Sequence, residues 1–238
     1  MRDAALIETR DLHAFYGESH ILHGVTFAVR PGECIGLMGR NGMGKSTLLR
    51  SLLAIVRQRW GTVRVRGVDM TNATPDAIAR AGIAYVPEGR GIFGNLTVRE
   101  NLVMAARPGF NGNRDWTFER VLETFPRLRE RLDYSGTQLS GGEQQMLTIG
   151  RALMTNPDLL ILDEATEGLA PLIAKEVWSI LHEIRQHGIA SIVVDRDYRS
   201  VCRLADRCIV LVKGKIALED LAKELQADTT ILSKYLSV

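Results

Sequence analysis

The sequence has few of the features that crosslink a chain, export it or anchor it in a membrane. Only three of its 238 residues are cysteines, and none of them forms a C-x-x-C pair. We therefore expect reduced thiols, as is usual in the cytosol, rather than disulfides or a cysteine metal site. No apolar run approaches the roughly 18 residues that cross a bilayer. The first residues also lack the apolar core of a signal peptide, so we expect any membrane role to depend on a partner.

Basic and acidic side chains are almost balanced. The chain has 30 basic and 28 acidic side chains, which gives a formal net charge of +2. This balance gives no electrostatic argument for binding nucleic acid or an anionic membrane surface. Hydrophobic residues make up 45% of the chain, which is ordinary for a globular protein. Because repeats, low-complexity tracts and flexible linkers are also lacking, the sequence predicts one compact α/β unit with a helical insertion.

Residues 39–47 fit the pattern G-x-x-x-x-G-K-[ST], in which backbone N–H groups surround a polyphosphate. The apolar run Cys34–Met38 before it predicts a buried strand, and the apolar spacing of Thr47–Leu53 predicts a helix. Together these elements direct N–H groups and a positive helix end at phosphates. A glycine-rich turn that binds nothing is the alternative, and the flanking strand and helix disfavour it. The predicted binding residues are Gly39, Arg40, Asn41, Gly42, Met43, Gly44, Lys45, Ser46 and Thr47.

Within this loop we expect Lys45 to reach the β- and γ-phosphates and the Ser46 hydroxyl to ligate Mg²⁺. Farther along, the apolar run Leu159–Leu162 predicts a buried strand that ends in two carboxylates, Asp163 and Glu164. Ligands of open α/β sheets bind beyond the carboxyl ends of the strands. We therefore expect Asp163 to hold Mg²⁺ through water and Glu164 to polarise an attacking water as general base. Taken alone, the acidic pair would be a solvated strand end.

A third motif begins at Ser140, which has capping-box spacing to Glu143 before an apolar helical pattern. Gly141 and Gly142 would stand in the first turn of that helix, where glycine is costly for helix propensity. Their presence is explained if the turn approaches an anion with its N–H groups exposed. Without the other motifs, an ordinary capped helix would be the simpler interpretation.

The run L-S-G-G-x-Q at Leu139–Gln144, with the two motifs above, makes the chain resemble the ATP-binding cassette (ABC) family, from about Leu6 to Leu218. The resemblance implies an α/β fold: a P-loop NTPase (RecA-like) core with an antiparallel β subdomain and an α-helical subdomain. It also implies a single nucleotide-binding domain over residues 1–238, with the helical subdomain inserted at about 89–140. The implied cofactors are ATP and Mg²⁺.

The resemblance also implies roles for single residues. Cassettes of this family pair head to tail around two ATP molecules, so Ser140, Gly141 and Gly142 would contact the ATP held by the partner cassette. Tyr16 would stack on adenine, although by itself it would be an ordinary core or surface tyrosine. Glu88 stands where most cassettes have glutamine, and its carboxylate could ligate Mg²⁺ as well as the amide does.

A narrower resemblance, to branched-chain amino acid importer ATPases of the LivF type, is carried by Val86–Arg90, Leu96–Val98 and Gly168–Pro171. It implies an ATPase at the cytoplasmic face of the inner (plasma) membrane, energising uptake of branched-chain or related amino acids. The implied partners are integral-membrane permease subunits, a sister ABC ATPase or a second copy of this chain, and, indirectly, an extracytoplasmic solute-binding protein. No nucleic-acid partner is implied.

Three alternatives to this function are open. The transported solute could be urea or another small amide. The chain could instead be a nucleotide-binding assembly subunit with weak hydrolysis, whose sister cassette does most of the chemistry. A cassette that acts on ribosomes or DNA rather than in transport is the third, and the near-neutral charge and compact length disfavour it.

The sequence departs from the family pattern in two places. Arg196 stands where most cassettes have a switch histidine, and arginine cannot copy the neutral imidazole. It could act as a catalytic residue by contacting the γ-phosphate, or Asp195, Asp197 or Glu164 could hold it in a structural salt bridge, which we favour. We expect Arg196 to slow turnover and leave ATP binding intact. Ala165–Glu167 also replaces the expected Pro-Ser/Thr segment, which loosens that loop.

Overall fold

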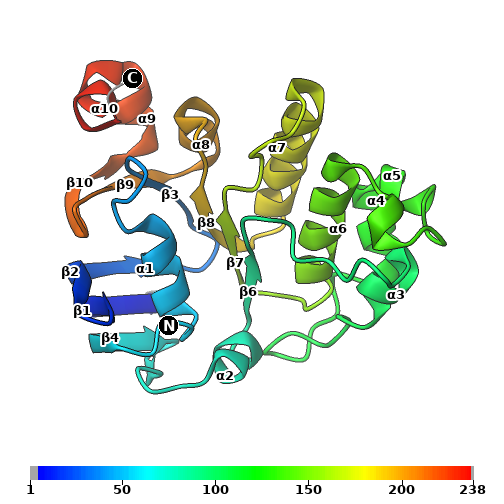
Figure 1. Ribbon diagram of the computed structural model, residues 1–238, viewed down its shortest axis with the longest axis horizontal. Coiled ribbons are helices and arrows are strands. Elements are labelled where there is room, and N and C mark those ends of the chain that lie inside the picture. Colours follow the sequence, from blue (N-terminus) through cyan, green and yellow to red (C-terminus); the bar gives the residue numbers. More distant parts are fainter. Residues whose placement is uncertain (1–4, 237–238) are drawn as a thin grey trace.

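The computed structural model describes residues 5–236, which fold around two β-sheets (Figure 1). The larger sheet has the strand order β10-β9-β3-β8-β7-β6. The five strands β9, β3, β8, β7 and β6 run parallel to their neighbours in the sheet. The edge strand β10 runs antiparallel to β9. The bounds of its strands are β3 Cys34–Met38, β6 Ile83–Val86, β7 Leu159–Asp163, β8 Ala190–Val194, β9 Arg207–Val212 and β10 Lys215–Leu221.

The central strands of this sheet are apolar throughout because both faces are covered. In β7, Leu159 and Ile161 pack into a core with helix α1 and the smaller sheet. The alternate residues, Leu160 and Leu162, pack into a second core formed with the helices on the other face. The helices of these two layers are α1 (Lys45–Leu52) on the first face, and α6 (Gly141–Leu153), α7 (Pro171–Gln186) and α8 (Tyr198–Leu204) on the second.

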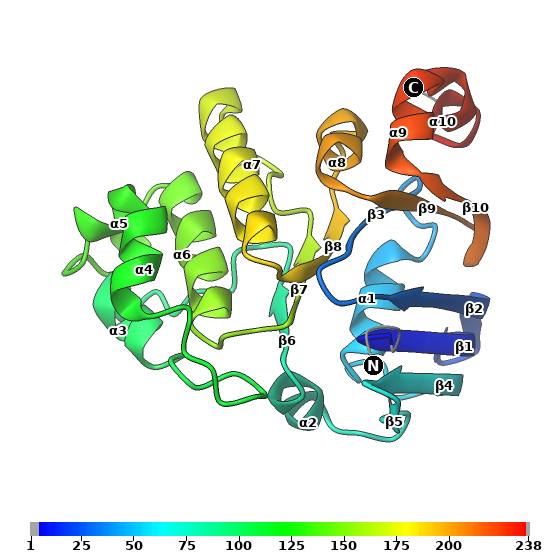
Figure 2. The same ribbon diagram turned by 180° about the vertical axis from the view of Figure 1, so that it is seen from behind.

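The smaller sheet is antiparallel, with the order β2-β1-β4-β5. Figures 1 and 2 both show its strands stacked on the α1 side of the molecule. The alternating run Gly61–Gly67, which predicts a half-exposed antiparallel strand, is confirmed over residues 61–65 of β4, whereas Arg66 and Gly67 form the turn that follows. The bounds of its strands are β1 Ile7–Tyr16, β2 Ser19–Val29, β4 Arg59–Val65 and β5 Val68–Asp69.

The middle of the chain contains short helices at the opposite end of the molecule from the antiparallel sheet (Figure 1). The expected capping box between Thr97 and Glu100 is confirmed at the start of α3. The helical pattern from Thr97 to Arg131 is broken more often than the sequence suggests, because Pro126 starts a new helix directly after α4. These helices are α3 Val98–Val103, α4 Phe118–Thr124 and α5 Pro126–Arg129. Helix α2 (Pro75–Arg80), which precedes β6, lies nearer the antiparallel sheet (Figure 2).

The C-terminal part follows the predicted pattern closely. The long helix expected over Ile173–His187 is α7, and the hairpin turn expected at Lys213–Gly214 joins β9 to β10. The short terminal helices are α9 Ala222–Ala227 and α10 Thr229–Leu236. Across residues 5–236, every helix is too short or too polar to serve as a membrane span.

Candidate nucleotide site

The phosphate loop joins the end of β3 to the start of α1, as the motif predicts. Gly44 is the N-cap of α1 and has φ = 100°, a left-handed conformation that favours glycine. The Lys45 ammonium donates to the carbonyl oxygens of Gly39, at 2.8 Å, and Arg40, at 3.2 Å. It therefore lies over the loop, beside the N–H groups of the first helical turn, which have no partner within the helix.

The β9–β10 hairpin supports this loop from outside. The Gly214 N–H donates to the Met43 carbonyl oxygen at 3.1 Å, and the Lys213 N–H approaches the Met43 sulfur at 3.2 Å. Desolvation lowers the pKa of Lys45, whereas the nearby Glu164 and Asp163 carboxylates oppose that shift. The lysine is thus a partly buried cation that two acidic groups accompany.

Asp163 is held from two sides at the end of β7. The Ser46 hydroxyl donates to Asp163 Oδ1 at 3.2 Å, and the Tyr85 hydroxyl donates to Oδ2 at 3.1 Å. The aspartate is fully buried. Burial and the Asp163 charge raise the pKa of Tyr85 to about 12, so this hydroxyl keeps its proton and acts as a donor.

Sequence reasoning missed Tyr85. The signal that could have found it is a hydroxyl-bearing side chain inside the otherwise apolar strand Ile83–Val86. Because β6 pairs in parallel with β7, a polar group near its carboxyl end lies near the acidic end of β7.

Glu164 follows Asp163 directly and has a left-handed backbone, with φ = 51°, which is uncommon for a residue other than glycine. Its carboxylate Oε2 lies 3.2 Å from the Arg196 Nε. Arg196 also forms an ion pair with Glu167. Burial and then Glu167 raise the pKa of Glu164 to about 7, although Arg196 acts in the opposite direction.

The two segments that depart from the family pattern contact each other. Besides the pairs made by Arg196, the backbone N–H and the hydroxyl of Thr166 donate to Asp195 Oδ2 at 3.1 and 2.6 Å. Of the three salt-bridge partners considered for Arg196, the structure shows Glu164. Asp195 is engaged by Thr166, and Asp197 accepts the Ser200 N–H as the N-cap of α8.

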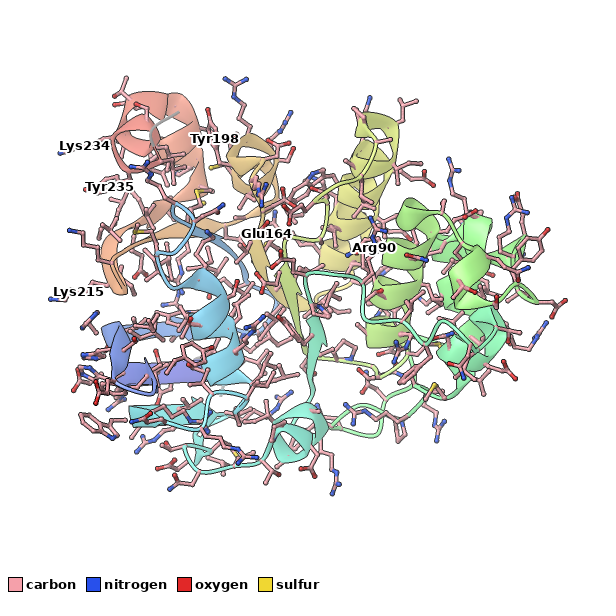
Figure 3. All side chains as sticks on the ribbon, viewed as in Figure 1. Arg90, Glu164, Tyr198, Lys215, Lys234 and Tyr235 are labelled. Carbon is pink, nitrogen blue, oxygen red and sulfur yellow. The ribbon has the colours of Figure 1, made fainter. Side chains whose placement is uncertain are left out.

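Glu88 lies close to these acidic side chains. Oxygens of Glu88, Glu164 and Glu167 all lie within 4.8 Å of one another. Figure 3 shows Glu164 near the centre of the molecule, beyond the end of β7, and Arg90 across from it toward α6. These groups border one cleft, which is lined by Glu88, Gly89, Arg90, Gln144, Gln145, Glu164 and Glu167.

The L-S-G-G-x-Q segment (Leu139–Gln144) leads into the start of α6, and the capping box predicted between Ser140 and Glu143 is confirmed. The Ser140 N–H donates to Glu143 Oε2 at 2.8 Å, and the Glu143 N–H donates to Ser140 Oγ at 3.3 Å. A Cβ at Gly141 would lie 2.7 Å from the Arg90 guanidinium, and one at Gly142 would collide with Ile173 of α7. Packing against Ile173 thus supplies a second reason for Gly142, whereas the flexible Arg90 side chain could move away from a Cβ at Gly141.

The structure brings some expected site residues together and separates others. Lys45, Ser46, Asp163 and Glu164 meet at the carboxyl ends of β3 and β7. Ser140–Gly142 start α6, which lies on the opposite side of β6 and β7 from α1 (Figure 1). Tyr16 ends β1 and is 48% exposed.

Comparison with known proteins identifies the family. The ABC transporter family profile matches residues 22–167. The high-affinity branched-chain amino acid transport ATP-binding protein BraG of Pseudomonas aeruginosa is 41% identical, covering 93% of this chain and 95% of BraG. The probable branched-chain amino acid transport ATP-binding protein LivF of Archaeoglobus fulgidus is 33% identical, covering 92% of this chain and 94% of LivF.

Solved structures agree with this assignment and confirm the α/β fold. The structure of an ATP-binding subunit of an ABC transporter has a TM-score of 0.81 and 27% identity, covering 95% of this chain and 94% of that one. The phosphate loop, the capped L-S-G-G-x-Q helix and the acidic strand end all occur in this chain in that order. The chain therefore belongs to the ABC transporter family, as one of its ATP-binding cassettes, the ATPases that power transport.

Proposed function

We propose that the chain is the ATPase subunit of an importer for branched-chain or related amino acids. The observation that carries the ATPase role is the convergence of Lys45, Ser46, Asp163 and Glu164 at the carboxyl ends of β3 and β7, which flank β8 in the larger sheet. The solute class is supported by BraG and LivF, which are named as branched-chain amino acid transport ATP-binding proteins and whose full lengths this chain nearly covers.

In the proposed site, Lys45 and the loop N–H groups bind the β- and γ-phosphates, and Tyr16 stacks on adenine. Glu164 polarises the attacking water. Ser140, Gly141 and Gly142 contact the ATP bound by the partner cassette, so that each site is completed by a second cassette.

Mg²⁺ prefers oxygen ligands, and it would supply charge neutralisation on the phosphates. The donors available are of that kind: the Ser46 hydroxyl and the buried Asp163 carboxylate, which lie 3.2 Å apart, and the exposed Glu88 carboxylate. Because Tyr85 also holds Asp163, this carboxylate is fixed in orientation. We propose that these three side chains hold the ion.

The proposed organisation is one nucleotide-binding domain, with residues about 89–140 as a helical subdomain. As an ABC cassette, the chain has membrane permease subunits as partners. We propose that it works at the cytoplasmic face of the membrane, with a sister cassette or a second copy, and that an extracytoplasmic binding protein delivers the solute.

Reconstitution tests the solute and the coupling together. The chain, its permease subunits and its binding protein in liposomes are expected to take up labelled leucine only with ATP. The matched variant Glu164→Gln should bind ATP and abolish uptake. Uptake of urea in place of leucine would replace the proposed solute, and leucine uptake that continues with Glu164→Gln would contradict the proposed role of this chain.

One observation favours the second candidate, a subunit that hydrolyses ATP weakly beside a more active sister cassette. The Arg196–Glu164 ion pair occupies an oxygen of the proposed base and stabilises its charge, which lowers its basicity. We expect Arg196→His to change the ATPase rate of the assembled complex without changing nucleotide affinity. An unchanged rate would remove the argument for slow hydrolysis in this site.

A further inference from the structure

A second group of titratable side chains lies on the antiparallel sheet, outside the proposed nucleotide site. Three of the chain's five histidines, His13, His20 and His23, fall within eleven consecutive positions of β1 and β2. Both strands bury their other face against α1, through residues such as Leu12 and Leu22. The histidines are half-buried, so solvent reaches this outer face.

Two of these imidazoles point nitrogen atoms at each other. His13 Nδ1 and His20 Nε2 are 2.9 Å apart, and His13 Nε2 is 3.2 Å from Asp11 Oδ1. Because a carboxylate only accepts, the Nε2–H of His13 is the donor to Asp11. His13 Nδ1 therefore presents its lone pair toward His20, whose Nε2–H donates to it; binding a metal through His20 Nε2 requires that proton to move to Nδ1 of the same ring.

The backbone is distorted where it presents these groups. Asp11 has φ = 48°, and the β1–β2 pairing shifts register between Thr9 and Phe15. A Cβ at Gly24 would lie 2.7 Å from Asp11 Oδ1 and 3.6 Å from His13 Nε2. Left-handed residues and bulges redirect side chains along a strand, and here they place the Asp11 carboxylate beside Nε2 of His13.

The surroundings of His23 favour its neutral form. The His23 and His20 ring centroids are 3.9 Å apart, and Phe15 stacks on His20 at 4.2 Å. Desolvation, His20, Lys215 and His13 each lower the pKa of His23. Lys215 projects outward from β10 beside this sheet (Figure 3).

We propose that His13 Nδ1 and His20 Nε2 form a binding site for a divalent transition-metal ion such as Zn²⁺, Co²⁺ or Ni²⁺, with Asp11 as the group that orients His13. Imidazole suits these ions, unlike Mg²⁺. Two nitrogens about 2 Å from one tetrahedral zinc lie about 3.3 Å from each other, so a small separation of the rings, whose facing nitrogens are 2.9 Å apart in their hydrogen bond, would admit the ion. A carboxylate on the second nitrogen is the usual support of a metal-binding histidine. The other coordination positions face solvent, and the site is independent of the proposed function.

Metal titration of the tag-free, full-length chain tests this site. The protein is freed of metal with a chelator and titrated with Co²⁺ alone, followed by absorbance, and with Zn²⁺ by calorimetry. We expect one ion per chain, with ligand-field bands that Zn²⁺ abolishes. His13→Gln and His20→Gln should each lower affinity at least tenfold, and Asp11→Asn about tenfold. The matched control His182→Gln, on exposed α7 surface, should bind as the parent chain does.

Other groups could bind these ions, and the design separates them. Buried Cys202 and Cys208, with sulfur atoms 3.9 Å apart, would give thiolate charge-transfer bands, and the Glu88 cluster would bind equally well in His20→Gln. Either result overturns the proposal, as does the absence of binding. If a histidine variant fails to fold, Co²⁺ added to the parent chain must broaden the ring proton signals of His13 and His20 and spare those of His187.

Discussion

The phosphate loop and the pair of loops after β7 and β8 differ in how they are built. The phosphate loop matches its sequence pattern at each defined position, and Lys45 contacts carbonyls five and six residues away. The second region departs from the family pattern in both of its segments, and the departing residues contact one another across about thirty residues of sequence.

This difference shows that the two departures belong together. Asp195 receives both donors of Thr166, and Arg196 pairs with Glu164 and Glu167. By itself, Glu167 would only add negative charge near the phosphates. In the structure this charge is paired with Arg196 of the neighbouring loop. A change in one segment is therefore expected to have a smaller cost when its partner changes too.

The largest effect is expected in the phosphate loop. Lys45→Ala removes the cation that lies over the loop, and we expect ATP turnover to fall about 100-fold or more. Calorimetry with Mg·ATP and an ATPase assay of the assembled complex measure the loss. Lys223→Ala, an exposed change on α9, is the control, and unchanged ATP binding in Lys45→Ala would refute the site.

The second largest effect is expected at Asp163, which lies between the phosphate loop and the loop after β7. Tyr85→Phe removes one of the two donors to the buried Asp163. Because a hydrogen bond to a charged group is involved, we expect a loss of about 2 kcal/mol in the free energy of unfolding. Urea denaturation measures it. Tyr134→Phe, at an exposed site, should change stability by less than about 0.5 kcal/mol, and equal effects for the two variants would contradict the proposed support.

Thr166→Val tests the bond between the two departing segments. It removes the hydroxyl donor to Asp195 and keeps the side-chain shape. The expected loss of stability is about 1.5 kcal/mol, since the acceptor is charged and partly buried. Thr230→Val removes a similar bond to Asp228 at an exposed position, so its cost should stay below about 0.5 kcal/mol. If the two losses matched, the Thr166–Asp195 contact would have no special weight.

The smallest expected effect is the coupling between Arg196 and Glu167. Their side chains are 61% and 30% exposed, so solvent screening limits the pair to about 0.5–1 kcal/mol. A double-mutant cycle with Arg196→Gln and Glu167→Gln, read by urea denaturation, measures it. The more exposed Arg80–Asp76 pair should give no more than about 0.5 kcal/mol. If the effects of Arg196→Gln and Glu167→Gln on the free energy of unfolding were strictly additive, the two segments that depart from the family pattern would not be coupled through this pair.

The sequence by itself determined the elements whose causes are local. The glycine loop with its flanking strand and helix, the Thr97 and Ser140 capping boxes, and the acidic end of β7 all depend on neighbouring residues. These elements can therefore be predicted from the sequence, because turn geometry, capping and apolar periodicity depend on residues only a few positions apart.

The tertiary structure alone decided which distant side chains meet. That Tyr85 holds Asp163, that Arg196 chooses Glu164 and Glu167 over its adjacent aspartates, and that His13 faces His20 follow from strand register and loop conformation. These contacts join residues that are not neighbours in the sequence, and no periodic sequence pattern predicts that they meet. Since a single register shift or left-handed residue redirects a side chain, only the assembled sheets determine them.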